Sequence, residues 1–138
     1  PVEYVLPFPG ILPTHPFYRL KTLRDRIIEL LIADPVNKAE FYILQADKKL
    51  NMAVTLMNIS KTTEAQVSFG DALAARNQAI TTLETYVKSG NSVPGYLNQK
   101  LLLSLTKHME ILVGMGRDNS AVDAMIGRVQ LLSGSTLQ

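Results

Sequence analysis

A proline-rich, apolar stretch near the N-terminus, YVLPFPGILPTHPFYRL at residues 4–20, constrains this fold more than any other feature. Pro7, Pro9, Pro13 and Pro16 lack backbone donors and disfavour helical geometry at the residues before them, so we expect an extended arm. The same stretch carries large apolar side chains, those of Tyr4, Leu6, Phe8, Ile11, Leu12 and Phe17. Exposed together they would form a sticky patch, so we expect them to dock, either on the bundle of their own chain as a strap or on a neighbouring chain.

Beyond Pro16 the apolar residues recur at spacings of three and four, which is typical of amphipathic helices. The first such stripe comprises Leu20, Leu23, Ile27, Leu30 and Leu31. A second helix is expected to open at the Asp34–Pro35 pair, since aspartate caps a helix and proline suits its first turn. Its inner positions include several alanines, which suit close contact between helices.

Further helices are expected over residues 63–88, from about residue 97 to 113, and from residue 120 to about 132. The breaks between them are SGNSVPG at residues 89–95 and GMGRDNS at residues 114–120. These patterns predict an all-α, up-and-down bundle of four to five helices with an extended N-terminal arm. We assign residues 1–15 to the arm, 16–133 to the helical bundle and 134–138 to a polar tail.

Composition limits the classes of function. A chain of 138 residues suits one domain, and its net charge of +2 gives little electrostatic reason to bind nucleic acid. It has no cysteine, so disulfides and thiolate chemistry are excluded. No apolar run is long enough to span a bilayer. Because the sequence begins at Pro1 rather than Met, we expect a processed form or an excised piece.

The first 57 residues carry several motifs that occur together in one family. They are Tyr4–Pro13, His15–Lys21, Arg24–Asp25, Asp34–Pro35 and Ala46–Leu50. In this combination the chain resembles an exported bacterial and archaeal helical family known as domain of unknown function 5667. The resemblance covers about residues 4–57, is weak through the third predicted helix, and does not extend beyond about Leu97.

Family members usually follow a signal peptide or a lipid anchor, so the resemblance implies an extracytoplasmic location, secreted or at the cell surface. Any membrane contact would then be made through an N-terminal anchor outside this sequence. The family has no established activity, so the resemblance implies a fold and a location but no chemistry.

Few side chains suggest chemistry. His15 and His108 are the only histidines, and we interpret them as a surface or capping residue and a core residue, so no metal site is expected. Arg76 interrupts an apolar stripe, and with His108 it is the candidate ligand contact. We interpret Arg24 and Asp25 as a structural ion pair that ties the first helix to the arm or to the second helix. No nucleophile–base arrangement or phosphate loop is present, so neither catalysis nor a cofactor is expected.

Two hypotheses of function follow. The leading one is a non-catalytic, extracytoplasmic bundle that acts through protein–protein contacts, a self-assembling subunit of a filament or surface layer whose arm docks on a neighbour. The alternative is a sensor or ligand-binding bundle, monomeric, with the arm as an intramolecular strap. That alternative requires a pocket with convergent polar groups, such as Arg76 and His108 with Asp25 or Asp47.

Overall fold

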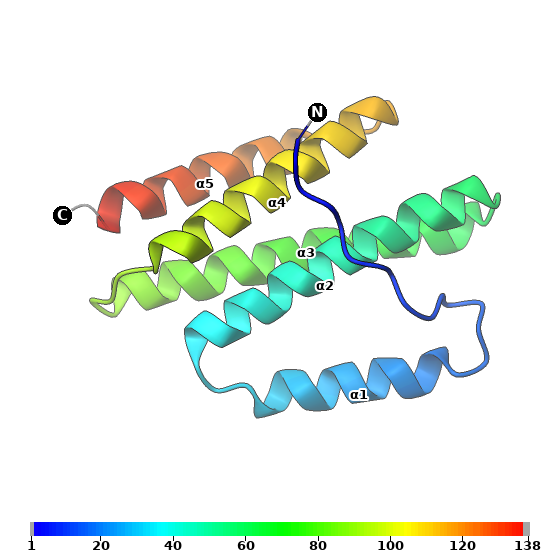
Figure 1. Cartoon of the computed structure of the whole chain (residues 1–138), viewed down its shortest axis with the longest axis horizontal. Helices are drawn as coiled ribbons and strands as arrows, with labels where there is room; N and C mark the ends of the chain where they lie inside the picture. Colours follow the sequence, from blue (N-terminus) through cyan, green and yellow to red (C-terminus); the bar gives the residue numbers. More distant parts are fainter. Residues whose placement is uncertain (1, 137–138) are drawn as a thin grey trace.

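The computed structural model describes residues 2–136, with side chains described for residues 2–133. Within these residues the chain is all-helical and has no strand, which confirms the predicted fold class (Figure 1). The helices are α1 (Tyr18–Leu31), α2 (Pro35–Asn58), α3 (Thr62–Lys88), α4 (Gly95–Gly114) and α5 (Ser120–Thr136). Since α5 continues to Thr136, the segment predicted as a polar tail is helical as far as that residue, and residues 137–138 lie outside the description.

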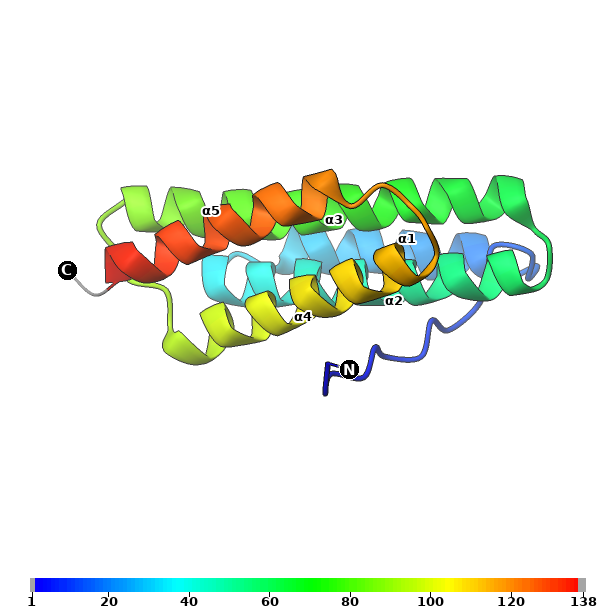
Figure 2. The same cartoon turned by 90° about the horizontal axis from the view of Figure 1, so that it is seen from above.

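The helices form three tiers. The long antiparallel pair α2–α3 lies in the middle, with the α4–α5 pair on one side and α1 on the other (Figures 1 and 2). Local signals set the boundaries as the sequence indicates. The Asp34 side chain accepts a hydrogen bond from the backbone of Val36, and Pro35 occupies the first turn of α2. Gly90 and Gly116 adopt positive φ angles of 91° and 66° beyond the ends of α3 and α4.

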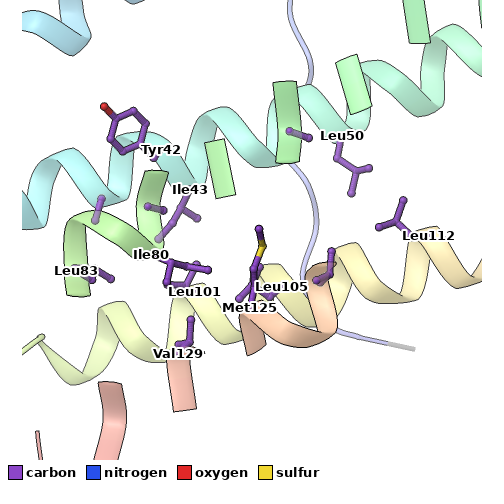
Figure 3. Packing of buried hydrophobic residues seen from close by; sticks show 14 of the residues in the cluster. Tyr42, Ile43, Leu50, Ile80, Leu83, Leu101, Leu105, Leu112, Met125 and Val129 are labelled. Atoms are coloured by element: carbon purple, nitrogen blue, oxygen red, sulfur yellow. The ribbon is translucent and has the colours of Figure 1, made fainter. Parts of the chain in front are cut away.

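The core lies between α2, α3, α4 and α5 (Figure 3). Small side chains let α2 and α3 approach closely, and the buried alanines of these helices are Ala39, Ala46, Ala53, Ala65, Ala72, Ala75 and Ala79. Large aliphatic side chains fill the space toward α4 and α5, including the fully enclosed Leu83 and Leu105. The alanines predicted on the inner face of α2 are therefore buried, where this helix packs against α3.

The arm crosses the outside of its own bundle over α2 and α4 (Figure 1). The backbone N–H of Val2 donates to the Glu110 carboxylate at 3.4 Å, and Asn51 Nδ2 donates to the carbonyl of Pro7 at 2.9 Å. Leu6 and Leu12 pack against the core cluster. Within the single chain the arm therefore contacts its own bundle, and its role as an intramolecular strap and its docking on a neighbouring chain both stay predictions.

Helix α1 is oriented in an unusual way. It has no buried residue, and its polar side chains face the bundle: Tyr42 Oη donates to Glu29 at 2.8 Å, and Lys49 Nζ donates to the Tyr18 hydroxyl at 2.8 Å. The apolar stripe of α1 points to solvent; its members are exposed by 64% (Leu20), 56% (Leu23), 49% (Ile27), 85% (Leu30) and 77% (Leu31). An amphipathic helix ordinarily turns such a stripe toward the core, so α1 is inverted relative to that expectation.

Candidate functional site

Four polar side chains meet inside the bundle. Asp47 comes from α2, Arg76 from α3, and Ser104 and His108 from α4, and each is at most 5% exposed. Ser104 and His108 are four residues apart, so both project from the same face of α4. With Tyr4 of the arm, these residues form what we call the Asp47 cluster.

Hydrogen bonds run through the cluster in one direction. Arg76 Nη1 lies 2.8 Å from His108 Nδ1, and His108 Nε2 lies 2.8 Å from Asp47 Oδ1. A guanidinium can only donate, so Nδ1 must accept, and the imidazole proton then resides on Nε2. His108 is thus a neutral relay that donates to the carboxylate of Asp47 and accepts from the cation of Arg76.

Two hydroxyls complete the coordination of the Asp47 carboxylate. Ser104 Oγ donates to Oδ1 at 2.5 Å, and the Tyr4 hydroxyl donates to Oδ2 at 2.5 Å. Both oxygens of this enclosed carboxylate are therefore satisfied, as a buried charge requires. Because Tyr4 supplies one of these donors, the arm is part of the cluster.

Burial dominates the electrostatics of the cluster. Desolvation lowers the pKa of His108 below its ordinary value, and the charge of Arg76 acts in the same direction, while the bond to Asp47 opposes both. Desolvation also lowers the pKa of Arg76 to about 10, against the attraction of Asp47. Arg76 is therefore still a cation at neutral pH. Burial and the bond to Asp47 raise the pKa of the Tyr4 hydroxyl.

A serine, a histidine and an aspartate together suggest a hydrolase triad, but their connections differ from one. In a triad the serine donates to the histidine, which then serves as its base. Here Ser104 donates to Asp47, and the second nitrogen of His108 is engaged by Arg76. Among the described residues of the cluster no hydrogen bond joins a nucleophile to a base, so its connections are not those of a hydrolase triad.

The structure brings some predicted site residues together and separates others. Arg76 and His108 are in direct contact, with Asp47 as their partner. Asp25 belongs to α1 and instead lines a cavity of about 250 Å³ between that helix and α2–α3. Arg24 Nη2 does lie 3.4 Å from Asp25 Oδ1, but Arg24 is largely exposed, and among residues 2–133 no hydrogen bond or salt bridge links this pair to the arm or to α2. A surface pair of this kind contributes little to stability.

The arm residues divide into two sets. Tyr4, Leu6 and Leu12 face the bundle, and Ile11 is half-buried. Phe8 and Phe17 are 82% and 60% exposed, so they do not serve as strap contacts. Inward-facing and outward-facing side chains alternate as far as Leu6, as expected of an extended chain. The alternation shifts at Pro7, so that Pro9 is buried and Phe8 is exposed.

The sequence alone does not identify two features of the cluster. It does not predict Ser104 as a site residue, and it predicts Tyr4 as an arm contact but not as a hydrogen-bond donor to Asp47. The usable signal for Ser104 was its place four residues before His108 on the apolar face of α4. His15 is exposed, and its Nδ1 accepts from the backbone N–H of Phe17 at 3.1 Å. Phe17 itself is the N-cap of α1, and no side chain caps this helix, so of the two predicted roles of His15 the structure supports the surface role and not the capping role. Among residues 2–136 no group of three candidate metal ligands is found.

The buried neutral state of His108 predicts acid sensitivity. Its folded pKa lies below 6.5, so below about pH 6.5 the unfolded chain binds more protons and the free energy of unfolding falls. The expected slope between pH 7 and 5 is at most about 1.4 kcal/mol per pH unit from this group. Urea titrations at pH 7, 6 and 5 should show the decline in the wild type and in His15→Gln. The decline should be smaller in His108→Gln, whose amide can keep both bonds; an equal decline there would refute the assignment.

Comparison with known proteins finds no family model, no curated protein and no solved structure that matches this chain. The resemblance of the first 57 residues is therefore an expectation that these comparisons leave untested. Among the described residues, no helix combines the length and apolarity needed to cross a bilayer.

Proposed function

We propose that the chain is a non-catalytic, extracytoplasmic protein that works through protein–protein contacts, and that a second copy of itself binds the apolar face of α1. The supporting observation is the outward stripe of α1, in which Leu20, Leu23, Ile27, Leu30 and Leu31 are all exposed. Single exposed leucines are ordinary, but an aligned set on one helix is typical of an interface.

The spacing along α1 favours another copy as the partner. Leu20, Leu23, Ile27 and Leu30 follow steps of three and four, the pattern with which one helix packs along another. A two-fold axis needs only one self-complementary patch, and it closes the assembly as a dimer.

Charge decides the direction of this pairing. Arg19, Arg24 and Arg26 flank the stripe, and a parallel pair would bring these cations together. An antiparallel pair that crosses at Ile27 instead sets Arg24 of one copy near Leu30 of the other. Arg24 of each copy then lies close to the C-terminal end of the other α1, which is the negative end of its helix dipole.

The arm has a supporting role in this proposal. Lys21 Nζ donates to the carbonyl of Pro9 at 3.2 Å, and Asn51 holds Pro7, so the strap fixes the start of α1 relative to α2. A second version of self-assembly is exchange of the arm, in which Tyr4 of one chain reaches Asp47 of the next. Such a head-to-tail contact continues into a filament unless a rotation closes it.

Sedimentation velocity over a hundredfold range of concentration tests the proposal. We expect the wild type to dimerise, Ile27→Asp to be monomeric with unchanged helical circular dichroism, and Val67→Asp to behave as the wild type. Val67 is 62% exposed on α3, so it controls for charge placed on an exposed aliphatic position. A wild type that stays monomeric would refute self-association, and polymers that persist in Ile27→Asp would show arm exchange instead.

A further inference from the structure

Arg76 also lines a second cavity, which His108 does not line. It has a volume of about 320 Å³ and lies between α3, the end of α4 and the first turn of α5. It is separate from both the α1 stripe and the cavity beneath α1. Its polar lining includes two guanidinium groups, Arg76 and Arg117.

Arg76 lines this cavity and has donors that no described residue uses. The residue is only 5% exposed, its Nη1 is bonded to His108, and its Nε is enclosed without a partner. Within the described part of the chain, Nη2 has no hydrogen-bond partner either, and it is not among the enclosed atoms. Because Arg76 lines the cavity, Nη2 is the donor that a bound acceptor would meet. Burying a cation while two of its nitrogens make no hydrogen bond costs free energy, unless a bound acceptor pairs with them.

Arg117 is held at the rim of the same cavity. Its guanidinium carbon lies 3.7 Å from the centre of the Phe69 ring, and its Nη2 donates to Gln66 Oε1 at 2.9 Å. Stacking and this bond fix the plane of the guanidinium, and they leave its other donors free for an acceptor. The cavity therefore has one buried cation, Arg76, and one cation at its rim, Arg117.

The remaining walls are largely apolar. Phe69, Leu73, Leu112 and Val122 line the cavity, and Gly70 leaves it open, since a Cβ added there would meet nothing within 4 Å. The acidic lining residue is Asp118, whose Oδ1 accepts from the backbone N–H of Ser120 at 3.0 Å. That bond directs the carboxylate of Asp118 to the start of α5, where the side chain is exposed.

We propose that this cavity binds a small organic carboxylate with an apolar body. Its carboxylate oxygens accept hydrogen bonds from Arg76 Nη2 and from Arg117, because planar guanidinium groups match carboxylate geometry. Its apolar body packs against Phe69, Leu73 and Leu112. Inorganic phosphate offers the same charge chemistry but nothing to cover the apolar walls, so it should bind more weakly.

Titration of the ¹⁵N-labelled full chain with sodium benzoate, followed by nuclear magnetic resonance, tests this proposal. Benzamide, which lacks the negative charge, and inorganic phosphate, which lacks the apolar body, serve as comparison probes. We expect saturable shifts of backbone amides around Gly70, Arg117 and Val122 with benzoate. Binding of benzamide or phosphate as tight as that of benzoate would overturn the proposal.

Three variants locate the site. Arg117→Gln should weaken benzoate binding by about tenfold, the effect of losing one charge-assisted hydrogen bond. Gly70→Leu should abolish binding by filling the cavity while both arginines stay in place, and leucine favours the helix over glycine. Lys100→Gln removes a positive charge from an exposed position of α4 outside this cavity and should leave the affinity for benzoate unchanged. If benzoate binds Gly70→Leu as it binds the wild type, the site lies elsewhere and the proposal is wrong.

Discussion

Replacing Asp47 with alanine is expected to lower the free energy of unfolding by about 3–5 kcal/mol, the cost of removing one partner from a buried charge pair. Asp47 is 1% exposed and accepts three hydrogen bonds, from Tyr4, Ser104 and His108. Without it, the hydroxyl of Ser104 and the imidazole N–H of His108 have no acceptor, and the cation of Arg76 loses its counter-charge. Urea titration at pH 7, followed by circular dichroism, measures the loss.

Two milder variants separate charge from hydrogen bonding at Asp47. Tyr4→Phe removes a single donor at the rim and should cost about 1 kcal/mol, the usual net value of one hydrogen bond. Asp47→Asn keeps the shape and one acceptor oxygen but removes the charge, so its cost should fall between the two. If Asp47→Ala lowers the free energy of unfolding no more than Tyr4→Phe does, the stability of the cluster does not depend on the Asp47 carboxylate, and the prediction is wrong.

Tyr4→Phe also reports on the arm. If the arm is an intramolecular strap, the cost should not depend on protein concentration, because both partners belong to one chain. Pairing through α1 would raise the stability of the wild type and of Tyr4→Phe alike, whereas exchange of arms between copies would make the cost of Tyr4→Phe rise with concentration by mass action.

The sequence predicted the helices well because their signals are local. Spacing of apolar residues, the Asp34–Pro35 start and the glycine-containing breaks each act within a few residues of the boundary they set. The alanines of α2, such as Ala46 and Ala53, likewise report their own burial, because a small side chain in an apolar stripe indicates a close neighbour. These features need no knowledge of what lies across the core.

The orientation of α1 could not be predicted in the same way. The pattern from Leu20 to Leu31 shows which face of the helix is apolar, but not which side of that face the bundle occupies. The polar contacts that turn the helix over, Glu29 with Tyr42 and Tyr18 with Lys49, join residues distant in sequence. Each is unremarkable on its own helix, so only the assembled structure reveals the inversion.

The Asp47 cluster was predictable in part. Arg76 and His108 each break an apolar stripe, which marks them as polar groups that need partners. Which carboxylate satisfies them depends on the rotation of α2 relative to α4, and periodicity leaves that rotation open. The contribution of Tyr4 depends on the path of an arm without regular structure.

The second large effect concerns α4, where the packing inferred from the sequence rests on periodicity alone. Leu105 is fully enclosed, whereas Leu103, two residues earlier on the same helix, is 39% exposed. Leu105→Ala should lower the free energy of unfolding by about 3–4 kcal/mol, because the lost burial is compounded by the cavity left behind. Leu103→Ala removes the same atoms from a half-open position and should cost less than about 1 kcal/mol.

The comparison of these two leucines tests the rotation of α4 independently of its helicity. Two residues along a helix correspond to a turn of about 200°, so a helix rotated by that amount would exchange their roles. A larger loss in Leu103→Ala than in Leu105→Ala would therefore contradict the packing of α4 against α2. It would also move Ser104 and His108, because both lie within one turn of Leu105 on the face that meets Asp47. Burial of Leu105 and assembly of the Asp47 cluster are thus two consequences of one orientation of α4, so evidence against the first is also evidence against the second.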